Sequence, residues 1–149
     1  MSFLPSMDIA ASGITAQKRR MDTITENIVN RETTRTDDGG PYRRKLSVFR
    51  EIQHNNGFAR ALRYASARQD DGTKGGVMVS EIIEDASDFI PVYDPNHPDA
   101  GEDGYVMMPN VNTTTEIVDA MAATRSYTAN ITVFEAIKQM ALKAMEIGR

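Results

Sequence analysis

The sequence predicts an α+β fold in which long N- and C-terminal helices pair in a coiled-coil-like manner, with a small central antiparallel β region between them. Two observations support the helices, because apolar residues recur at helical spacing near each end of the chain. A third supports the β region, because short alternating segments between them are bounded by Gly-, Pro- and Asp-rich stretches. At 149 residues the chain has room for about one ordinary core.

Residues 1–36 form the first predicted region, whose helix begins near Ser2 or Ser6 and ends near Asn30. At 1.5 Å per residue this helix is about 40 Å long, which favours a partner helix over burial in one small core. A core-facing stripe would nevertheless have the same spacing. The apolar stripe follows the a/d spacing of a coiled coil and runs through Phe3, Met7, Ala10, Ile14, Gln17, Met21, Ile24 and Ile28. Within it we predict an assembly interface at Met7, Ala10, Ile14, Met21, Ile24 and Ile28.

Residues 37–112 form the central β-rich region, which follows the helix-breaking stretch RETTRTDDGGP. Alternation predicts a strand over 46–52, although Phe49 falls on the wrong face, a second over 77–84 and a third over 89–93. Segment 53–76 is variable in character, since loop-like ends flank a piece that fits either a short helix or a strand. Residues 93–110 are predicted to form a rigid Pro/Asp/Gly loop.

Residues 113–149 form the last region, a helix that reaches Ile147. Thr113 and Glu116 have the spacing of a capping box. The helix is rich in β-branched residues, so packing against neighbours must supply much of its order. Two apolar seams on displaced faces cannot both be covered by one partner helix. From these seams we predict an assembly interface at Ile117, Met121, Ile131, Val133, Ile137, Met140 and Ile147.

Charge is distributed unevenly between the two halves of the chain. Residues 1–76 hold 13 Lys and Arg against 9 Asp and Glu, whereas residues 77–149 hold 4 against 12. From Val77 to Thr124 there are ten acids and neither Lys nor Arg, so this region repels nucleic acid and anionic lipid. The acidic stretch fits a solvated surface, and it also fits acidic and basic faces of neighbouring subunits that meet and set their register.

Several classes of function are not expected. The chain has no cysteine, no apolar stretch of membrane-spanning length, and a start, MSFLPSMDIAASG, that lacks the features of a cleaved signal peptide. His54 and His97 belong to no metal-binding pair, and the nucleotide-binding and nucleophile motifs are missing. Arg43, Arg44 and Lys45 form too short a basic run to indicate a nucleic-acid site. We therefore expect no cofactor, no metal and no enzyme activity.

A calcium site is the sharpest chemical alternative, because the stretch after Tyr93 gathers several oxygen ligands. The spacing is not that of an EF-hand loop, and Pro95 and Pro98 favour a rigid array of turns instead. The oxygen-bearing side chains are Asp94, Asn96, Asp99, Glu102 and Asp103.

Three parts of the sequence resemble the flagellar axial protein family of bacteria. The first is SGITAQKRRMDTITENIVNRETT near the start, and the third is Arg125-Ser126-Tyr127 with Ala129-Asn130 near the end. Between them, GGVMVSEIIED and VYDPNHPDAGEDGYVMMPNVN resemble the central signature of the proximal rod branch of that family. The resemblance covers about 80% of the chain and misses chiefly the variable 53–76 segment. Its signature loop residues are Tyr93, Asp94, Pro95, His97, Pro98, Asp99, Gly104, Tyr105, Pro109 and Asn110.

The resemblance implies a structural subunit of the basal-body rod, a hollow periplasmic shaft that transmits torque. It implies that the terminal helices form an inner tube and that the subunit leaves the cell, uncleaved, by the flagellar type III export apparatus. The implied partners are further copies of the chain, other proximal and distal rod proteins, and the rod-base adaptor of the export gate. The alternative is a soluble coiled-coil adaptor that uses the same helices in a closed dimer.

Overall fold

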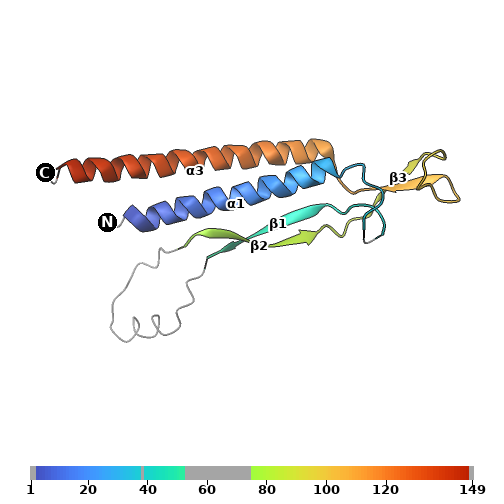
Figure 1. Ribbon diagram of the computed structural model, residues 1–149, viewed down its shortest axis with the longest axis horizontal. Helices are drawn as coiled ribbons and strands as arrows, with labels where there is room; N and C mark the ends of the chain where they lie inside the picture. Colours follow the sequence, from blue (N-terminus) through green and yellow to red (C-terminus); the bar gives the residue numbers. More distant parts are fainter. Residues whose placement is uncertain (1–2, 38, 53–74, 148–149) are drawn as a thin grey trace, which may run out of the picture.

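The computed structural model describes residues 3–37, 39–52 and 75–147. Figure 1 shows an elongated molecule in which helices α1 and α3 run antiparallel, with α1 between α3 and strands β1 and β2. Strands β3 and β4 extend beyond the helical pair at the end where α3 begins. The fold is therefore α+β, as the sequence predicts. The elements are α1 (Phe3–Val29), β1 (Lys45–Glu51), β2 (Val77–Glu84), β3 (Ile90–Tyr93), β4 (Tyr105–Met108) and α3 (Thr113–Ile147).

The central β region consists of two separate two-stranded antiparallel sheets, β1–β2 and β3–β4. Strands β1, β2 and β3 lie where the alternation predicts them. Strand β4 lies inside the stretch predicted as a loop, because its four residues are too short a run to stand out among turn residues. Segment 53–74, which contains most of the variable piece, lies outside the described residues.

Phe49, which falls on the wrong face of the predicted alternation, lies on the α1-facing side of β1, since Ser47 on the same face donates its hydroxyl to Thr23 of α1 at 2.9 Å. The register shifts between Val48 and Phe49, and Phe49 then pairs with Val79. Directly opposed residues share a face of the sheet, and Val79 is buried. The extra residue of this bulge is Ser80 of β2, and it brings the buried Val79 opposite Phe49.

Small residues let α1 and α3 approach closely. A side-chain carbon added at Gly13 would lie 2.9 Å from the amide nitrogen of Asn130, and Ala16 and Ala123 are almost fully buried. On α3 the residues with little exposure recur at alternating four- and three-residue steps, which is the spacing of one packed seam. These residues, the inner seam, are Glu116, Ala120, Ala123, Tyr127, Asn130, Phe134, Ile137 and Ala141.

Helix α3 is capped by Asn112. The Asn112 Oδ1 atom accepts hydrogen bonds from the backbone N–H groups of Thr114, at 3.0 Å, and Thr115, at 3.2 Å. The predicted capping box of Thr113 and Glu116 is wrong, because the Glu116 carboxylate does not turn back to the helix start. It points instead towards the buried donors of Asn27 and Arg44.

The buried side chain of Asn27 joins three segments of the chain. Its Nδ2 donates to the carbonyl oxygen of Lys45, at 2.9 Å, and to Glu116 Oε2, at 3.1 Å. Its Oδ1 accepts from the Tyr42 hydroxyl and from the backbone N–H of Lys45, both at 2.9 Å. All four hydrogen-bonding positions of the amide are thus occupied, although only 1% of the residue is exposed.

Arg44 balances the charge of Glu116 in the same place. Its Nε and Nη2 atoms both lie 2.6 Å from Glu116 Oε1, and Glu116 is 1% exposed. The backbone N–H of Arg44 donates to Asn110 Oδ1 at 2.8 Å. Asp119, one turn along α3, pairs with Arg20 of α1 at 3.0 Å. The end of α1, the start of β1 and the start of α3 therefore meet in one polar network.

The capping assignment predicts that Asn112→Ala lowers the free energy of unfolding by about 1 kcal/mol, because two N–H groups at the start of α3 lose their acceptor. Thr113→Ala is the matched control and should change that free energy by less than about 0.5 kcal/mol. Urea unfolding followed by circular dichroism measures both. A larger loss for Thr113→Ala than for Asn112→Ala would contradict the assignment.

The network predicts a larger effect for Glu116→Ala, about 3 kcal/mol of unfolding free energy, because Arg44 and Asn27 lose their buried partner. Glu135→Ala removes an exposed carboxylate from the same helix and should cost less than about 0.5 kcal/mol. The same urea measurement compares the two variants. Equal free energies of unfolding for Glu116→Ala and Glu135→Ala would show that the interactions of Glu116 make no net contribution to stability.

Burial raises the pKa of the Tyr42 hydroxyl from 10.0 to about 12, and the carboxylates of Glu26, Glu116 and Glu84 add to the effect. The unfolded phenol ionises near pH 10 while the folded one stays protonated, so this group's contribution to stability is present below pH 10 and is lost between pH 10 and about 12. Absorbance titration of tyrosinate should show a late component that Tyr42→Phe removes. If the unaltered chain and Tyr42→Phe gave the same absorbance titration between pH 10 and about 12, the raised pKa of Tyr42 would be contradicted.

Candidate assembly interface

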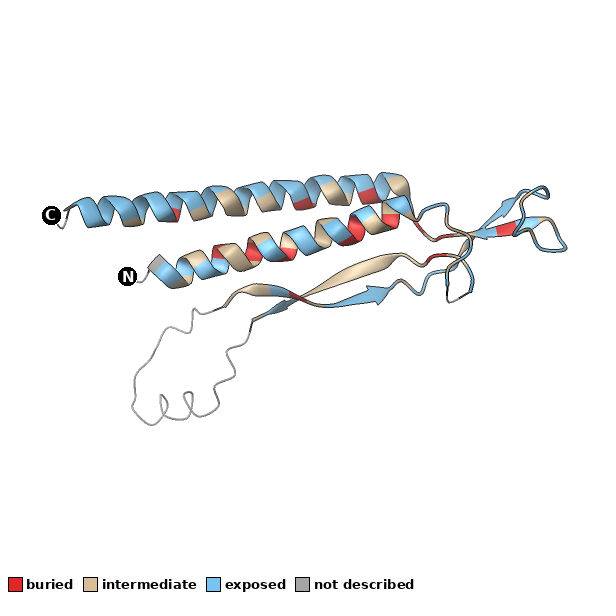
Figure 2. Ribbon diagram, in the orientation of Figure 1, coloured by how far each residue is buried: buried red, intermediate tan, exposed pale blue. Residues whose placement is uncertain are grey.

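One flank of α3 exposes large apolar side chains. Figure 2 shows that buried positions on α3 are few and that most of the helix is exposed. Ile117 and Met121 directly follow Glu116 and Ala120 of the inner seam, so they lie about 100° to one side of it. Their exposed fractions are 49% and 52%. This flank, the first outer seam, lies beside the α1 contact and is left uncovered by the part of the chain that the structure describes.

The opposite flank of α3 is apolar as well. Val133 and Met140 directly precede Phe134 and Ala141 of the inner seam, so they lie about 100° to its other side. Their exposed fractions are 51% and 54%. This flank, the second outer seam, together with the first, brackets the contact with α1. The two predicted faces of α3 therefore point in different directions, and their role in assembly stays a prediction.

Two members of the predicted α3 interface are less exposed than the residues of the outer seams. Ile131 is half-buried, and Ile137, 9% exposed, packs on the inner seam. The side chain of Ile147 lies outside the described part of the structure. Ile137 therefore belongs to the chain's own helix pair.

The predicted interface on α1 is largely occupied within the chain. Ala10 and Ile24 are buried, because α1 is covered by α3 on one side and by the β1–β2 sheet on the other. The Met21 sulfur lies 3.6 Å from the hydroxyl oxygen of Thr124, which donates its hydrogen bond to the carbonyl oxygen of Ala120 at 2.8 Å. The remaining positions of the prediction are half-buried: Met7, Ile14, Met21 and Ile28.

The β3–β4 hairpin carries the predicted signature residues Tyr93, Gly104 and Tyr105. The two tyrosine rings meet edge to face with centroids 5.2 Å apart. Gly104 has a φ of 73°, and a side-chain carbon there would lie 2.9 Å from the Tyr93 ring. Glycine is therefore required at this turn both by the backbone and by the ring packed against it.

The loop that joins β3 to β4 uses its polar atoms to hold its own shape. The Asp94 carbonyl oxygen accepts from the backbone N–H of His97 at 3.3 Å, and His97 Nδ1 accepts from that of Asp99 at 3.1 Å. Asp99 Oδ2 accepts from the Thr34 hydroxyl at 2.8 Å. Among the residues described, no three His, Asp or Glu side chains are grouped to hold a metal ion.

The base of the hairpin is fastened to the rest of the chain. Pro109 is fully buried, in contrast to the exposed Pro95 and Pro98 of the loop. Asn110 Nδ2 donates to Ser87 Oγ at 2.8 Å, while its Oδ1 accepts from Arg44. Hydrogen bonds from Ser87, with the nearby Arg44, lower the pKa of Asp85. Asn110 thus ties the hairpin to the polar network.

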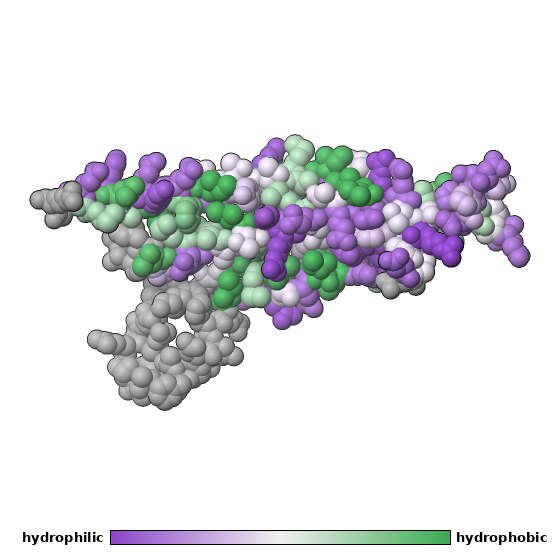
Figure 3. Space-filling view, viewed as in Figure 1, coloured by the Kyte–Doolittle hydropathy of each residue, from purple (hydrophilic) through white to green (hydrophobic). Residues whose placement is uncertain are grey.

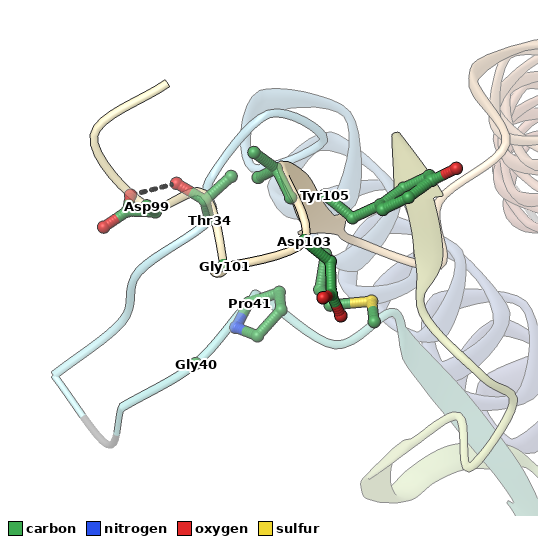
Figure 4. A pocket seen from close by; sticks show the side chains of 9 residues that line it. Thr34, Gly40, Pro41, Asp99, Gly101, Asp103 and Tyr105 are labelled. Carbon is green, nitrogen blue, oxygen red and sulfur yellow. Dashed lines mark hydrogen bonds between the residues drawn. The ribbon is translucent and has the colours of Figure 1, made fainter. Parts of the chain in front are cut away.

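A shallow cavity of about 370 Å³ lies between the 34–41 loop and the hairpin (Figure 4). The Thr34–Asp99 hydrogen bond crosses its rim. Its titratable side chains are Asp99, Asp103 and Tyr105, and none of its lining residues forms a nucleophile and base pair. In the part of the chain that the structure describes, neither α1 nor α3 contains an apolar run of membrane-spanning length.

Comparison with known proteins gives concordant matches. The family described as "Flagellar basal body rod FlgEFG protein C-terminal" matches residues 102–147.

Three relatives are each named flagellar basal-body rod protein FlgC. The protein of Bacillus subtilis (strain 168) is 43% identical, with all of both chains covered. That of Borreliella burgdorferi is 40% identical over 99% of this chain and 98% of its own. That of Salmonella typhimurium is 37% identical, again over both complete lengths. Because identity of this level extends along the whole chain, the chain belongs to the FlgC family of flagellar basal-body rod proteins.

Proposed function

We propose that this rod subunit assembles through the two outer seams of α3 into a hollow shaft that transmits torque. Family membership gives the structural role in the flagellar basal body and favours it over a soluble coiled-coil adaptor. The observation that carries the proposed mode of assembly is the exposure of Ile117 and Met121 on one flank of α3 and of Val133 and Met140 on the other.

Two opposite apolar flanks fit two different neighbours. A contact in which one flank of a subunit meets a different surface of the next is heterologous, and repetition without closure produces a helical array. Full burial of each large apolar side chain adds about 2 kcal/mol. Of the predicted α1 positions, the half-buried Met7, Ile14, Met21 and Ile28 keep an exposed edge for such neighbours.

The proposed partners are further copies of the chain, proximal and distal rod proteins, and the rod-base adaptor of the export gate. Passage through the flagellar type III export apparatus to the periplasmic part of the rod belongs to the same proposal. The role is structural and not catalytic, which accords with the names of the relatives.

Met121→Asp and Met140→Asp should each sharply reduce incorporation into basal bodies and swimming, because each places a charge in a contact that excludes water. Both residues are exposed in the single chain, so its free energy of unfolding should change by less than about 1 kcal/mol. Immunoblots of isolated basal bodies and swim-plate assays measure the two effects.

Ala136→Asp is the matched control, since it adds the same charge to α3 at an exposed position between the two outer seams. Ile24→Asp is unsuitable, because Ile24 is buried and the change would act first on the chain's own core. Normal swimming with stable Met121→Asp and Met140→Asp proteins would contradict the assignment of the outer seams.

A further inference from the structure

The β3–β4 hairpin exposes apolar side chains along its outer strand. All four residues of β3 are exposed, and Tyr93 has an exposed fraction of 64%. Residues Tyr105, Val106 and Met107 of β4 line the cavity beside the 34–41 loop, so β4 is the strand nearer to the rest of the chain. Within the described ranges no further strand pairs with β3. Strand β3 therefore forms the free edge of the hairpin, which projects from the molecule (Figure 1).

Both faces of this strand carry exposed apolar side chains. Ile90 and Val92 point to one face and are 48% and 42% exposed. On the other face Tyr93 lies opposite Tyr105, and the centroids of the two rings are 5.2 Å apart. A strand that is apolar on both sides buries more surface in a groove than on a flat patch. The side chains of the second face are Pro91, Tyr93, Tyr105 and Met107.

The outer edge of β3 favours contact through side chains over the addition of a further strand. The backbone N–H of Asp94 donates to the carbonyl oxygen of Gly104 at 3.0 Å. Hydrogen-bonded pairs alternate along an antiparallel ladder, so the backbone groups of Pro91 point away from β4. Proline has no N–H, so an added strand would lack one of its hydrogen bonds at this position.

The hairpin is braced within the chain. The backbone N–H of Gly101 donates to the carbonyl oxygen of Tyr105 at 3.0 Å, and Val106 is only 2% exposed. A surface that is ordered before binding loses less conformational entropy when it docks. Tyrosine and methionine are also enriched at the centres of protein interfaces. The exposed side chains of the hairpin are therefore suited to docking on another protein.

The acids of the connecting loop form a rim of negative charge beside the apolar strand. Figure 3 shows hydrophilic residues concentrated at the hairpin end of the molecule. The stretch from Val77 to Thr124 has no Lys or Arg, so the hairpin carries no cation that could offset this charge. None of these acids forms an ion pair with another described residue. The exposed acids of the loop are Asp94, Asp99, Glu102 and Asp103.

This charge indicates the chemistry of the partner. An apolar groove with Lys and Arg at its rim is the complement of an apolar strand with acids beside it. A second copy of this chain has the same net charge of -4 and is a poorer complement. An anionic lipid surface is repelled by the same acids. The observations thus favour a basic surface on a different protein.

We propose that β3, with Tyr105 and Met107 of β4, docks in an apolar groove with a basic rim on a different protein of the rod. This inference rests on the proposed rod assembly. Glu102 and Asp103 meet Lys or Arg side chains at the rim of the groove. The hairpin lies beyond the start of α3, whereas the outer seams flank that helix, so the two contacts use separate surfaces and can be tested separately.

Photocrosslinking from Tyr93 tests the contact directly. Tyr93→p-benzoylphenylalanine keeps an aromatic ring at this position and is introduced in the gene of the native host. Irradiation of isolated basal bodies should link this chain to one other rod protein, and mass spectrometry should place the link beside a Lys or Arg of that protein. Met107→p-benzoylphenylalanine, on the same face, should give the same linked protein.

The control places the same group at Ala136, an exposed residue of α3, and should give no link to that protein. A link from Tyr93 to a second copy of this chain, to a protein outside the rod, to lipid or to a segment without Lys and Arg would overturn the proposal. Normal incorporation of the Tyr93 and Met107 variants without any link would overturn it as well.

Charge exchange provides a second measurement that does not depend on photochemistry. Glu102→Lys with Asp103→Lys should lower incorporation about tenfold, because like charges then meet at the rim. Glu102→Gln with Asp103→Asn removes the charge without reversing it and should lower incorporation less. Replacing the linked Lys or Arg of the partner by Glu should restore incorporation of the reversed variant.

Unchanged free energies of unfolding of the purified variants separate docking from folding. Failure of restoration in stable proteins would overturn the docking. Absence of the unaltered chain from basal bodies, or normal swimming with stable Met121→Asp and Met140→Asp proteins, would instead contradict the proposed rod assembly through α3.

Discussion

The four hydrogen bonds of Asn27 are the constraint on which the rest of the structure depends. They attach the end of α1 to the backbone of β1 and to Glu116 at the start of α3, and Arg44 neutralises the carboxylate there. Buried polar groups of this kind add little net stability when satisfied but cost several kcal/mol when one partner is lost. Their effect is therefore to select one axial register for the helix pair.

That register divides α3 between two uses. Alanines and polar side chains fill the inner seam, where Gly13 and Asn130 bring the helices close together. The large apolar residues Ile117, Met121, Val133 and Met140 consequently remain on the flanks. A helix that is apolar on several sides must find more than one neighbour. The inner seam completes one of these contacts within the chain, and we propose that neighbours in the assembled rod complete the others.

The charge asymmetry of the sequence is partly satisfied within the chain. Arg20 and Arg44 from the basic half pair with Asp119 and Glu116 from the acidic half. The stretch from Val77 to Thr124, which contains the hairpin, has no Lys or Arg of its own. Pairing between the two halves therefore balances the carboxylates at the start of α3 and leaves the hairpin acidic.

The sequence by itself determined the elements and the family. Helical periodicity located α1 and α3, alternation located β1 and β2, and the signature stretches indicated a flagellar rod protein. These properties follow from the spacing of residues that are close together in the sequence, so they can be predicted from the sequence alone. Only the tertiary structure decided that Asn112 caps α3, that 105–108 forms a strand, and that Ile24 and Ile137 face inward while Ile117 and Met140 face outward. The sequence pattern did not predict the inner seam, because several of its members are alanines or polar residues such as Glu116 and Asn130. Such residues do not form a recognisable apolar stripe. Which side of a helix is covered depends on partners distant in sequence, here Asn27 and Arg44, and no local pattern contains them.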